Sequence, residues 1–403
     1  MEQAYNISRE PTCLVTPLGS YVVPVSTGSD PVDLSLVLPT FQEAKNIQAA
    51  LRQVASTLRS VEGLKFEILV IDDNSPDGTW QLALDESLRI PEVRVIRRTT
   101  ENGLATAVIR GWQAARGRVL GVMDADLQHP PEVLVQLVGA MAKGADLATG
   151  SRHVENGGVS DWSLLRRIIS RTAQLLGLVI LPEVVGRISD PMSGYFLLNR
   201  NVIGGRRLNP MGYKILIEVL ARGKVGTISE VGYVFRERQE GESKVSAVVY
   251  RQYLEHLFRL RLDLLRQSRF VQFCLVGLIG VGVDMGLLYL LSDPATLHWG
   301  LTRSKLIAAE AAIVNNFMWN DAWTFADLVG VSDSSKDKFH RFLKFNIICA
   351  IGLIFNVVLL NIQFNWLGMN RYVANIVAIL VATLWNYQIN KHLGWRSTSA
   401  VSK

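Results

Sequence analysis

Two acidic side chains, one residue apart, follow directly on an apolar run in the first half of the chain. These are Asp124 and Asp126, which come after the segment Val119–Met123. Side chains at positions i and i+2 of a strand point the same way, so we expect both carboxylates to project together from a strand's end. Paired carboxylates suit a hard cation, Mg²⁺ or Mn²⁺, and Gln128 adds a neutral oxygen two positions further on. Such a cation acts as a Lewis acid on a departing diphosphate, which favours transfer of a nucleotide-linked sugar.

The segments around these acids alternate between short apolar strands and amphipathic helices. We predict strands at 34–38, 66–71, 93–97, 119–123 and 147–150, and helices at 43–58, 79–88, 104–115 and 132–143. This alternation predicts an α/β fold with a doubly wound, Rossmann-like and mainly parallel sheet. Such sheets bind ligands at the carboxyl ends of their strands, where Pro39, the Asp72-Asp73 pair and Asp124 all fall.

The last third of the chain has the composition of a membrane domain. Apolar segments that approach the roughly 20 residues needed to cross a bilayer lie at about 270–291, 304–322, 342–365 and 371–391. Glu310 and Asn315 interrupt the second of them. Basic residues gather before the first segment, between the second and third, and after the last, which predicts a cytoplasmic catalytic part and C-terminus. We therefore expect a multi-pass protein of a prokaryotic plasma membrane, whose net charge of +6 reflects contact with anionic lipid, not nucleic acid.

Composition divides the 403 residues into four parts. Residues 1–31 are predicted to be a disordered, proline-containing lead, and residues 32–245 an α/β domain. Residues 246–268 are predicted to form an amphipathic helix in the bilayer interface, and the stretch 163–181 has the same character. Residues 269–396 are predicted to be the transmembrane domain.

The transmembrane part contains an internal repeat. Asn316 and Asn320 recur as Asn386 and Asn390, 70 positions later, within two predicted helix pairs of the same orientation. Such an arrangement is a parallel repeat. The first apolar segment contains four glycines, Gly277, Gly280, Gly282 and Gly286. Such small residues allow helices to approach closely, so the membrane part could also serve in self-association.

Seven segments of the first 245 residues form an ordered set. They are LPTFQEAKN at 38–46, IDDNSPDGT at 71–79, NGLATA at 102–107, MDADLQHPP at 123–131, GSR at 150–152, SDPMSGY at 189–195 and GESK at 241–244. In this order they resemble a family 2 glycosyltransferase of the dolichol- or polyprenol-phosphate mannose synthase type. The tail, with NFMWN at 316–320 and WTF at 323–325, is similar to the four-helix GtrA-like domain. Ala105 departs from the pattern, because the family often has glycine there.

The resemblance implies a GT-A fold, a nucleotide-sugar donor with GDP-mannose favoured, a polyprenyl or dolichyl phosphate acceptor, and Mg²⁺ or Mn²⁺. By resemblance, the nucleotide sugar would meet Pro39, Thr40, Glu43, Asp72, Asp73 and Lys244. The lipid phosphate would meet Arg152, Arg166 and Ser170, and the metal would be held by Asp124, Asp126 and Gln128. Asp124, Asp126, Arg152 and Arg238 are the residues expected to act in catalysis, with Arg238 and Lys244 on a loop that closes over the donor.

The mechanism that this implies is one inverting displacement. A polyprenyl phosphate is already anionic near neutral pH, so its oxygen can attack the anomeric carbon without a dedicated base. His129 and Glu132 are therefore expected to support the site, not to act as acid–base catalysts. Asp190 has two open interpretations, a cap of the turn into Pro191 and a functional role.

Two alternatives remain open at this point. The donor of the same reaction could be UDP-glucose, which would give a polyprenyl-phosphate glucose. A second alternative is a lipid-linked sugar flippase with a non-catalytic soluble domain. It is suggested by Asp284 and Glu310, because acids inside membrane segments are functional candidates.

Overall fold

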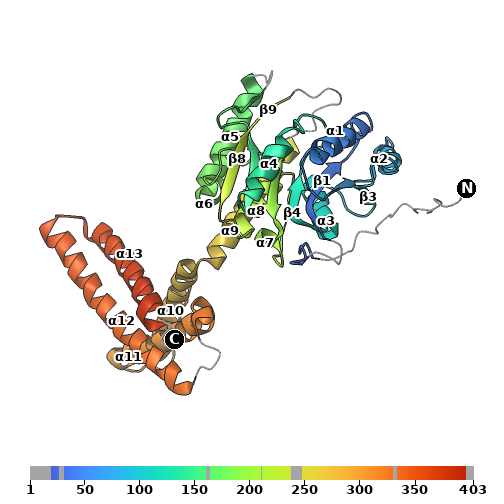
Figure 1. The fold of residues 1–403 in the computed structure, drawn as a ribbon. Helices are drawn as coiled ribbons and strands as arrows, with labels where there is room; N and C mark the ends of the chain where they lie inside the picture. The colour runs from blue at the N-terminus through green and yellow to red at the C-terminus, as the bar shows by residue number, and fades with distance from the viewer. Residues whose placement is uncertain are drawn as a thin grey trace, which may run out of the picture. The chain divides into compact units, whose positions relative to one another are not determined.

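The computed structural model describes residues 20–26, 31–159, 164–209, 211–236, 247–329 and 334–395; of 159, 164–170 and 247–250 it describes only the backbone. The chain divides into two compact units, Met1–Arg261 and Leu262–Lys403. The first unit contains the sheet and the second is helical (Figure 1). Each unit is described by itself.

A seven-stranded sheet with the order β3-β2-β1-β4-β7-β5-β8 forms the centre of the first unit. The strands are β1 (Val32–Thr40), β2 (Phe66–Asp72), β3 (Val93–Arg97), β4 (Gly117–Val122), β5 (Leu147–Ser151), β7 (Phe196–Asn199) and β8 (Ile228–Gly232). Every pairing is parallel except those of β7, which runs antiparallel to β4 and β5. This confirms the Rossmann-like, mainly parallel sheet.

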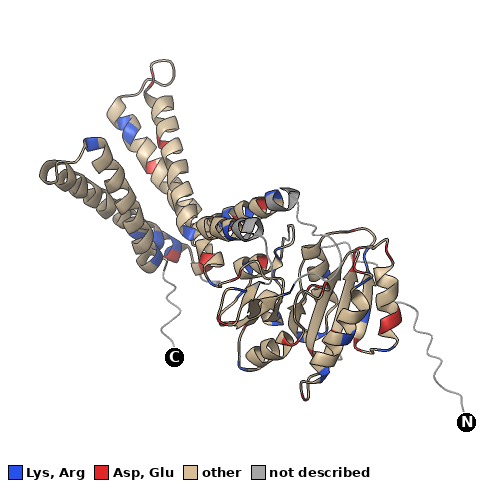
Figure 2. Cartoon of the chain, turned by 90° about the horizontal axis from the view of Figure 1, so that it is seen from above, with Lys and Arg blue, Asp and Glu red and all other residues tan. Residues whose placement is uncertain are grey.

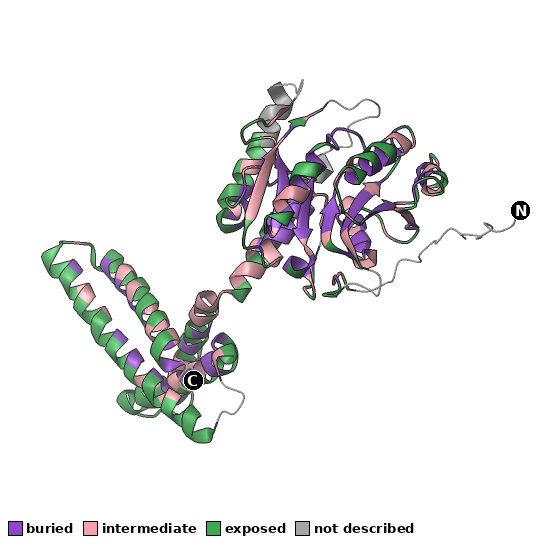
Figure 3. Ribbon diagram, viewed as in Figure 1, coloured by how far each residue is buried: buried purple, intermediate pink, exposed green. Residues whose placement is uncertain are grey.

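Apolar side chains cover both faces of the central strands, as a sheet buried between helices requires. Leu36 and Leu38 pack with one group of helices, and the alternate residue Val37 faces the other side. The helices between the strands are α1 (Ile47–Arg59), α2 (Thr79–Ser87), α3 (Leu104–Ala114) and α4 (Val133–Ala142). Figure 3 shows the central strands of this sheet buried, while the edge strand β8 is of intermediate burial.

Shorter elements complete the unit. They are β6 (Gly158–Val159), which pairs with β9 (Val234–Phe235), and α6 (Pro182–Val185), α7 (Arg200–Ile203) and α8 (Ile215–Arg222). The two expected amphipathic stretches are helices, α5 (Leu164–Ile180) and α9 (Ala247–Gln267). Part of the N-terminal lead contacts the domain: Val23 is fully buried, and Leu208 donates a backbone hydrogen bond to the carbonyl of Tyr21 (2.9 Å).

The second unit consists of two helical hairpins. Their helices are α10 (Arg269–Ser292), α11 (Leu301–Trp319), α12 (Ser335–Asn361) and α13 (Arg371–Ile389), with the short turns η1 (Asn320–Thr324), η2 (Ala326–Leu328), η3 (Ile362–Trp366) and η4 (Asn390–Gly394). Among the described residues, three stretches are long and apolar enough to span a membrane: Arg269–Ser292, Ser335–Trp366 and Arg371–Gly394. At the expected second span, α11 is helical but carries Arg303, Lys305 and Glu310. Figure 2 shows few charged residues along these helices.

The repeat is visible in how the hairpins pack. Asn316 lies against Gly280 in the first hairpin, and Asn386 lies against Gly352 in the second. Phe325 and Trp395, which follow the two repeated asparagines Asn320 and Asn390, stack with ring centroids 4.5 Å apart. Among the described residues, a Cβ at Gly277, Gly282 or Gly286 would meet nothing, whereas Gly280 is in close contact with Asn316.

Candidate active site

The carboxyl ends of β1 and β2 bring the first group of expected residues together. Thr40 and Asp72 are partners in the parallel register, one position after the paired residues Pro39, which is half-buried, and Ile71, which is fully buried. The Asp72 carboxylate accepts hydrogen bonds from the Thr40 hydroxyl (2.8 Å) and from the backbone N–H and hydroxyl of Ser75 (2.8 and 2.7 Å). Asp72 is fully buried, so its observed function is to shape the turn after β2.

Asp73 is the next residue of this turn, and its carboxylate is anchored. Oδ1 accepts from Arg98 Nε and Oδ2 accepts from the backbone N–H of Gly103, both at 2.7 Å. Burial raises the pKa of Asp73, although the Arg98 guanidinium opposes this. Glu43, close by, accepts from the Asn46 side chain (2.9 Å) and is almost fully buried.

A loop, not the strand itself, positions the two neighbouring acids. Strand β4 ends at Val122, so the expectation that both acids share one face of a strand is corrected. Asp126 is buried while the Asp124 side chain is 34% exposed. Leu127 takes a positive φ of 61°, and this turn brings the backbone N–H of Gln128 to Asp126 Oδ1 (3.2 Å).

The oxygen donors of this loop fit a hard divalent cation. The side-chain nitrogen of Gln128 donates to the carbonyl of Arg236 (3.1 Å), so its oxygen is the amide atom suited to a cation. In the part of the chain that the structure describes, no cluster of three or more His, Cys, Asp or Glu side chains forms a metal site. Mg²⁺ commonly uses one or two carboxylates and completes its shell with substrate phosphates and water, which matches Asp124, Asp126 and Gln128.

His129 lies beside Asp124, surrounded by the aromatic rings of Tyr195, Tyr233 and Phe235. Its ring is 5.0 Å from that of Tyr195 and 5.2 Å from that of Phe235, between centroids. His129 Nε2 lies 3.3 Å from Asp124 Oδ2, and the side chain is only 3% exposed. This placement orients Asp124 and keeps the imidazole away from solvent. Glu132 precedes α4 with its side chain 69% exposed.

Arg152, directly after β5, pairs with Asp190 from the loop before β7. Its Nε and one terminal nitrogen donate to the two carboxylate oxygens at 2.6 and 2.7 Å. Burial would raise the pKa of Asp190, but the Arg152 bonds outweigh it and hold that pKa below its ordinary value. Because β7 runs antiparallel between β4 and β5, this loop lies beside their carboxyl ends. A Cβ at Gly194 would stand 3.2 Å from Asp124 Oδ2.

Two protein families match this chain, one for each unit. Residues 35–203 match the family described as Glycosyl transferase family 2, and residues 272–395 match the GtrA/DPMS transmembrane domain. The dolichol-phosphate mannosyltransferase of Pyrococcus furiosus is 41% identical over 364 residues, which are 90% of this chain and 99% of that protein. The chain belongs to the dolichol-phosphate mannosyltransferase family. It is therefore a glycosyltransferase, and it carries a membrane domain.

Shorter relatives match the glycosyltransferase part. The dolichol-phosphate mannosyltransferase of Saccharomyces cerevisiae is 36% identical over 57% of this chain and 87% of its own. The polyprenol monophosphomannose synthase of Mycolicibacterium smegmatis is 38% identical over 52% of this chain and 80% of its own. Among solved structures, the glucosyl-3-phosphoglycerate synthase of Mycobacterium tuberculosis covers 57% of this chain and 80% of its own at 22% identity, with a TM-score of 0.46.

Four expected site residues of this glycosyltransferase cannot be placed by their side chains. Arg238 and Lys244 lie outside the described residues. Arg166 and Ser170 belong to helix α5, of which only the backbone is described at these positions. The remaining expected residues all lie in or directly after β1, β2, β4 and β5.

Lys214 is a candidate site residue of the glycosyltransferase domain that the motifs did not indicate. It immediately precedes α8, and its ammonium donates to the carbonyl of Met192 (2.7 Å). Loss of water around the ammonium and the nearby Arg152 guanidinium lower its pKa to about 8, while Asp124 and Asp190 oppose that shift. Lys214 thus places a cation near both Asp124 and the Arg152 pair. In the sequence it stands in no recognisable motif, so only the fold reveals it.

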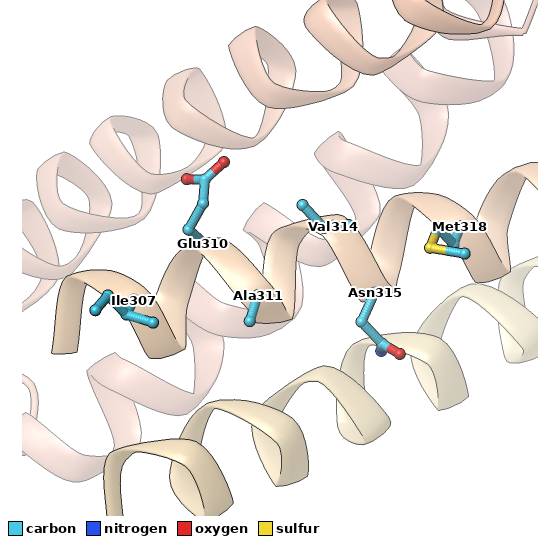
Figure 4. A pocket seen from close by; sticks show the side chains of 6 residues that line it. All are labelled: Ile307, Glu310, Ala311, Val314, Asn315 and Met318. Atoms are coloured by element: carbon cyan, nitrogen blue, oxygen red, sulfur yellow. The ribbon is translucent and has the colours of Figure 1, made fainter. Parts of the chain in front are cut away.

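The acidic residues of the membrane domain have different surroundings. Asp284 of α10 pairs with Lys305 of α11. Glu310 is exposed and lines an open hollow of about 510 Å³ whose described lining comes entirely from α11 (Figure 4). Figure 4 shows Glu310 and Asn315 pointing to different sides of that helix. Asp284 therefore has a partner inside its own hairpin.

Proposed function

We propose that this enzyme transfers mannose from GDP-mannose to the phosphate of a polyprenyl or dolichyl phosphate, with inversion at the anomeric carbon. The observation that supports this most strongly is the match to a dolichol-phosphate mannosyltransferase over 99% of that relative, which includes both domains. The product would be a lipid-linked monosaccharide, made at a membrane in which the C-terminal domain is embedded. We further propose that the catalytic domain faces the cytoplasm of a prokaryotic cell.

The nucleotide would bind at the ends of β1 and β2. Pro39, Thr40 and Glu43 would line its pocket, and the anchored Asp73 carboxylate would accept hydrogen bonds from the base. Asp72 would act indirectly by holding the turn, since it is fully buried, whereas Asp73 is only partly buried. Arg238 and Lys244 would close over the bound donor, as the resemblance implies.

Asp124, Asp126 and Gln128 would hold Mg²⁺ or Mn²⁺, for which their oxygen donors are suited. The bound cation would supply Lewis-acid stabilisation of the negative charge on the departing diphosphate. Lys214 adds a second positive charge near Asp124, and His129 fixes the Asp124 side chain. Cationic groups that meet charge as it develops are the largest single contribution to many enzymatic reactions.

Arg152, Arg166 and Ser170 would hold the acceptor phosphate in line with the sugar. An acceptor oxygen forms a bond to the anomeric carbon while the bond from that carbon to the diphosphate oxygen breaks, and the diphosphate keeps the electron pair. Because the acceptor is already an anion, no side chain has to remove a proton. Catalysis then consists of positioning and electrostatic stabilisation.

A donor and acceptor assay tests this proposal. Purified enzyme is incubated with a short-chain polyprenyl phosphate and either GDP-mannose or UDP-glucose, and the lipid product is identified by mass spectrometry. We expect a β-linked mannosyl phospholipid from GDP-mannose and at most trace product from UDP-glucose. Preferential transfer from UDP-glucose would replace the proposed donor, and absence of any lipid product would contradict the proposed reaction.

A further inference from the structure

A buried ionisable pair that the proposed mechanism does not use connects α9 to α8. His256 Nε2 of α9 lies 2.9 Å from Glu218 Oε2 of α8, and the two side chains are 3% and 0% exposed. A buried pair of this kind is costly to break, because the remaining group is left without compensation. The pair therefore defines where α9 can sit against α8.

Glu218 is held from three directions. Its other carboxylate oxygen accepts from the backbone N–H of Asn209 (2.6 Å) and pairs with Arg222 Nε (2.7 Å). Burial would raise the pKa of Glu218, but the hydrogen bonds from His256 and Asn209 and the positive charge of Arg222 together keep it below its ordinary value. A charged Glu218 requires His256 Nε2 to act as the hydrogen-bond donor.

The same face of α9 also packs on α5. Tyr253 donates its hydroxyl proton to the carbonyl of Ala173 (2.9 Å), and a Cβ at Gly177 would stand 2.7 Å from that hydroxyl. Leu257 and Leu260 continue this buried face at helical spacing. Helix α9 thus contacts α8 through His256 and α5 through Tyr253.

Helix α8 begins directly after Lys214, one helical turn before Glu218. A shift or rotation of α8 therefore moves the backbone from which the Lys214 ammonium donates to the Met192 carbonyl (2.7 Å), at a position where it also acts electrostatically on Asp124. We propose that His256 is a positioning residue for the transfer reaction, because through Glu218 it fixes α8 and thereby the Lys214 ammonium beside the departing diphosphate. This inference rests on the proposed function, which gives Lys214 its task.

Helix α9 also leads directly to the first candidate membrane span. Helix α9 ends at Gln267, and only Ser268 separates it from Arg269, where the first membrane span begins. The helix that leads to the first candidate membrane span is thus bonded, through His256 and Glu218, to the helix that Lys214 immediately precedes.

A double-mutant cycle on the full-length enzyme tests this coupling. KM for GDP-mannose and kcat are measured for His256→Leu, Lys214→Met and the double variant. We expect each single variant to raise KM for the donor or lower kcat/KM about tenfold, and the double variant to be no worse than Lys214→Met. His256→Gln, which keeps an N–H donor, should restore most of the loss. Additive effects in the double variant would overturn the inference.

Tyr253→Phe is the matched control on the same helix face. It removes one buried bond of α9, but to α5 instead of α8, so KM for the donor should stay within about twofold of wild type. An equal loss in Tyr253→Phe would show that general loosening of α9, not the His256–Glu218 bond, causes the defect, and would overturn the inference.

The outcomes separate this inference from the proposed function. If Lys214→Met leaves donor kinetics unchanged, the proposed task of Lys214 fails and the inference fails with it. If Lys214→Met is impaired but the cycle is additive, only the inference fails. Should His256→Leu not fold, the cycle is run with Glu218→Gln, which keeps the side-chain volume and weakens the same bond, with the same expected result.

Discussion

At the scale of single residues, the structure separates charges that are bonded within the protein from charges that face the substrates' expected position. Asp72 and Asp190 are almost fully buried and fully engaged with neighbours. Asp124 keeps a third of its side chain exposed, and Lys214 places a cation near it. Residue types alone did not distinguish buried, bonded acids from exposed ones, because Asp72 and Asp73 stand in a motif as rich in aspartate as that of Asp124 and Asp126.

Asp126→Asn is the sharpest substitution at the proposed metal site. It keeps the side-chain volume and the hydrogen bond from Gln128 but removes the negative charge, so we expect kcat to fall by about 100-fold or more with little change in unfolding temperature. Steady-state mannosyl transfer measures the effect. Asp85→Asn, on the exposed side of α2, is the matched control and should retain wild-type rates.

The Arg152–Asp190 pair predicts a pH effect on stability. The pKa of Asp190 is lower in the folded state than in the unfolded state. The Asp190 carboxylate therefore stabilises the folded protein fully above the unfolded-state pKa, about 4, and this stabilisation is lost as the pH falls through the lower folded-state value. Asp190→Asn should lower stability by about 3 kcal/mol at pH 7, because it leaves a buried guanidinium without its counter-charge. The difference from wild type should shrink as the pH drops below about 4. Unfolding temperatures between pH 7 and 3 test this, and a constant difference would contradict it.

At the scale of helices and strands, hydrophobic periodicity predicted the first five strands of the large sheet and the helices between them. The long helices and the five strands up to Ser151 lie where alternation of apolar segments placed them, within a few residues. Strand β7 has only four residues and runs antiparallel, so neither its length nor its direction could be inferred. Its insertion brings Asp190 to Arg152 and Gly194 to Asp124, and for this reason the pairing could not be predicted.

Two glycines give a matched test of the packing between helices and sheet. At Gly111 of α3, a Cβ would lie 2.7 Å from both Val37 methyl groups on β1. Gly111→Ala should therefore cost about 1–3 kcal/mol through overpacking. At Gly139 of α4, a Cβ meets nothing within 4 Å, so Gly139→Ala should stabilise by about 0.4–1 kcal/mol. Thermal unfolding compares the two; a destabilising Gly139→Ala would show that the α4 packing described here is wrong.

At the scale of the whole molecule, the chain joins a glycosyltransferase unit to two helical hairpins of a membrane domain. Composition predicted four spans. In the described part of the chain three stretches qualify by length and composition, and α11 is not among them because it carries two cations and one acid. The sequence predicted that the asparagines of the repeat recur, but not that they contact glycines of the neighbouring helix. Such a contact depends on which faces of the two helices meet.

Truncation after residue 268 tests how the two units divide the work. All the site residues assigned to donor, metal and acceptor phosphate precede this point, so we expect transfer to a short-chain, detergent-soluble acceptor to persist at a reduced rate. The rate with a long-chain acceptor in membranes should fall further. Complete loss with the short acceptor, in a truncated protein that still binds GDP-mannose, would assign a catalytic task to the membrane domain.

The central claim is that a cation held by Asp124, Asp126 and Gln128 offsets charge on the departing diphosphate. Its most direct test is the initial rate of mannosyl transfer in excess chelator, followed by titration with Mn²⁺ or Mg²⁺. The account predicts loss of turnover in chelator and full recovery as the metal is restored. An unchanged rate in metal-free buffer would contradict it.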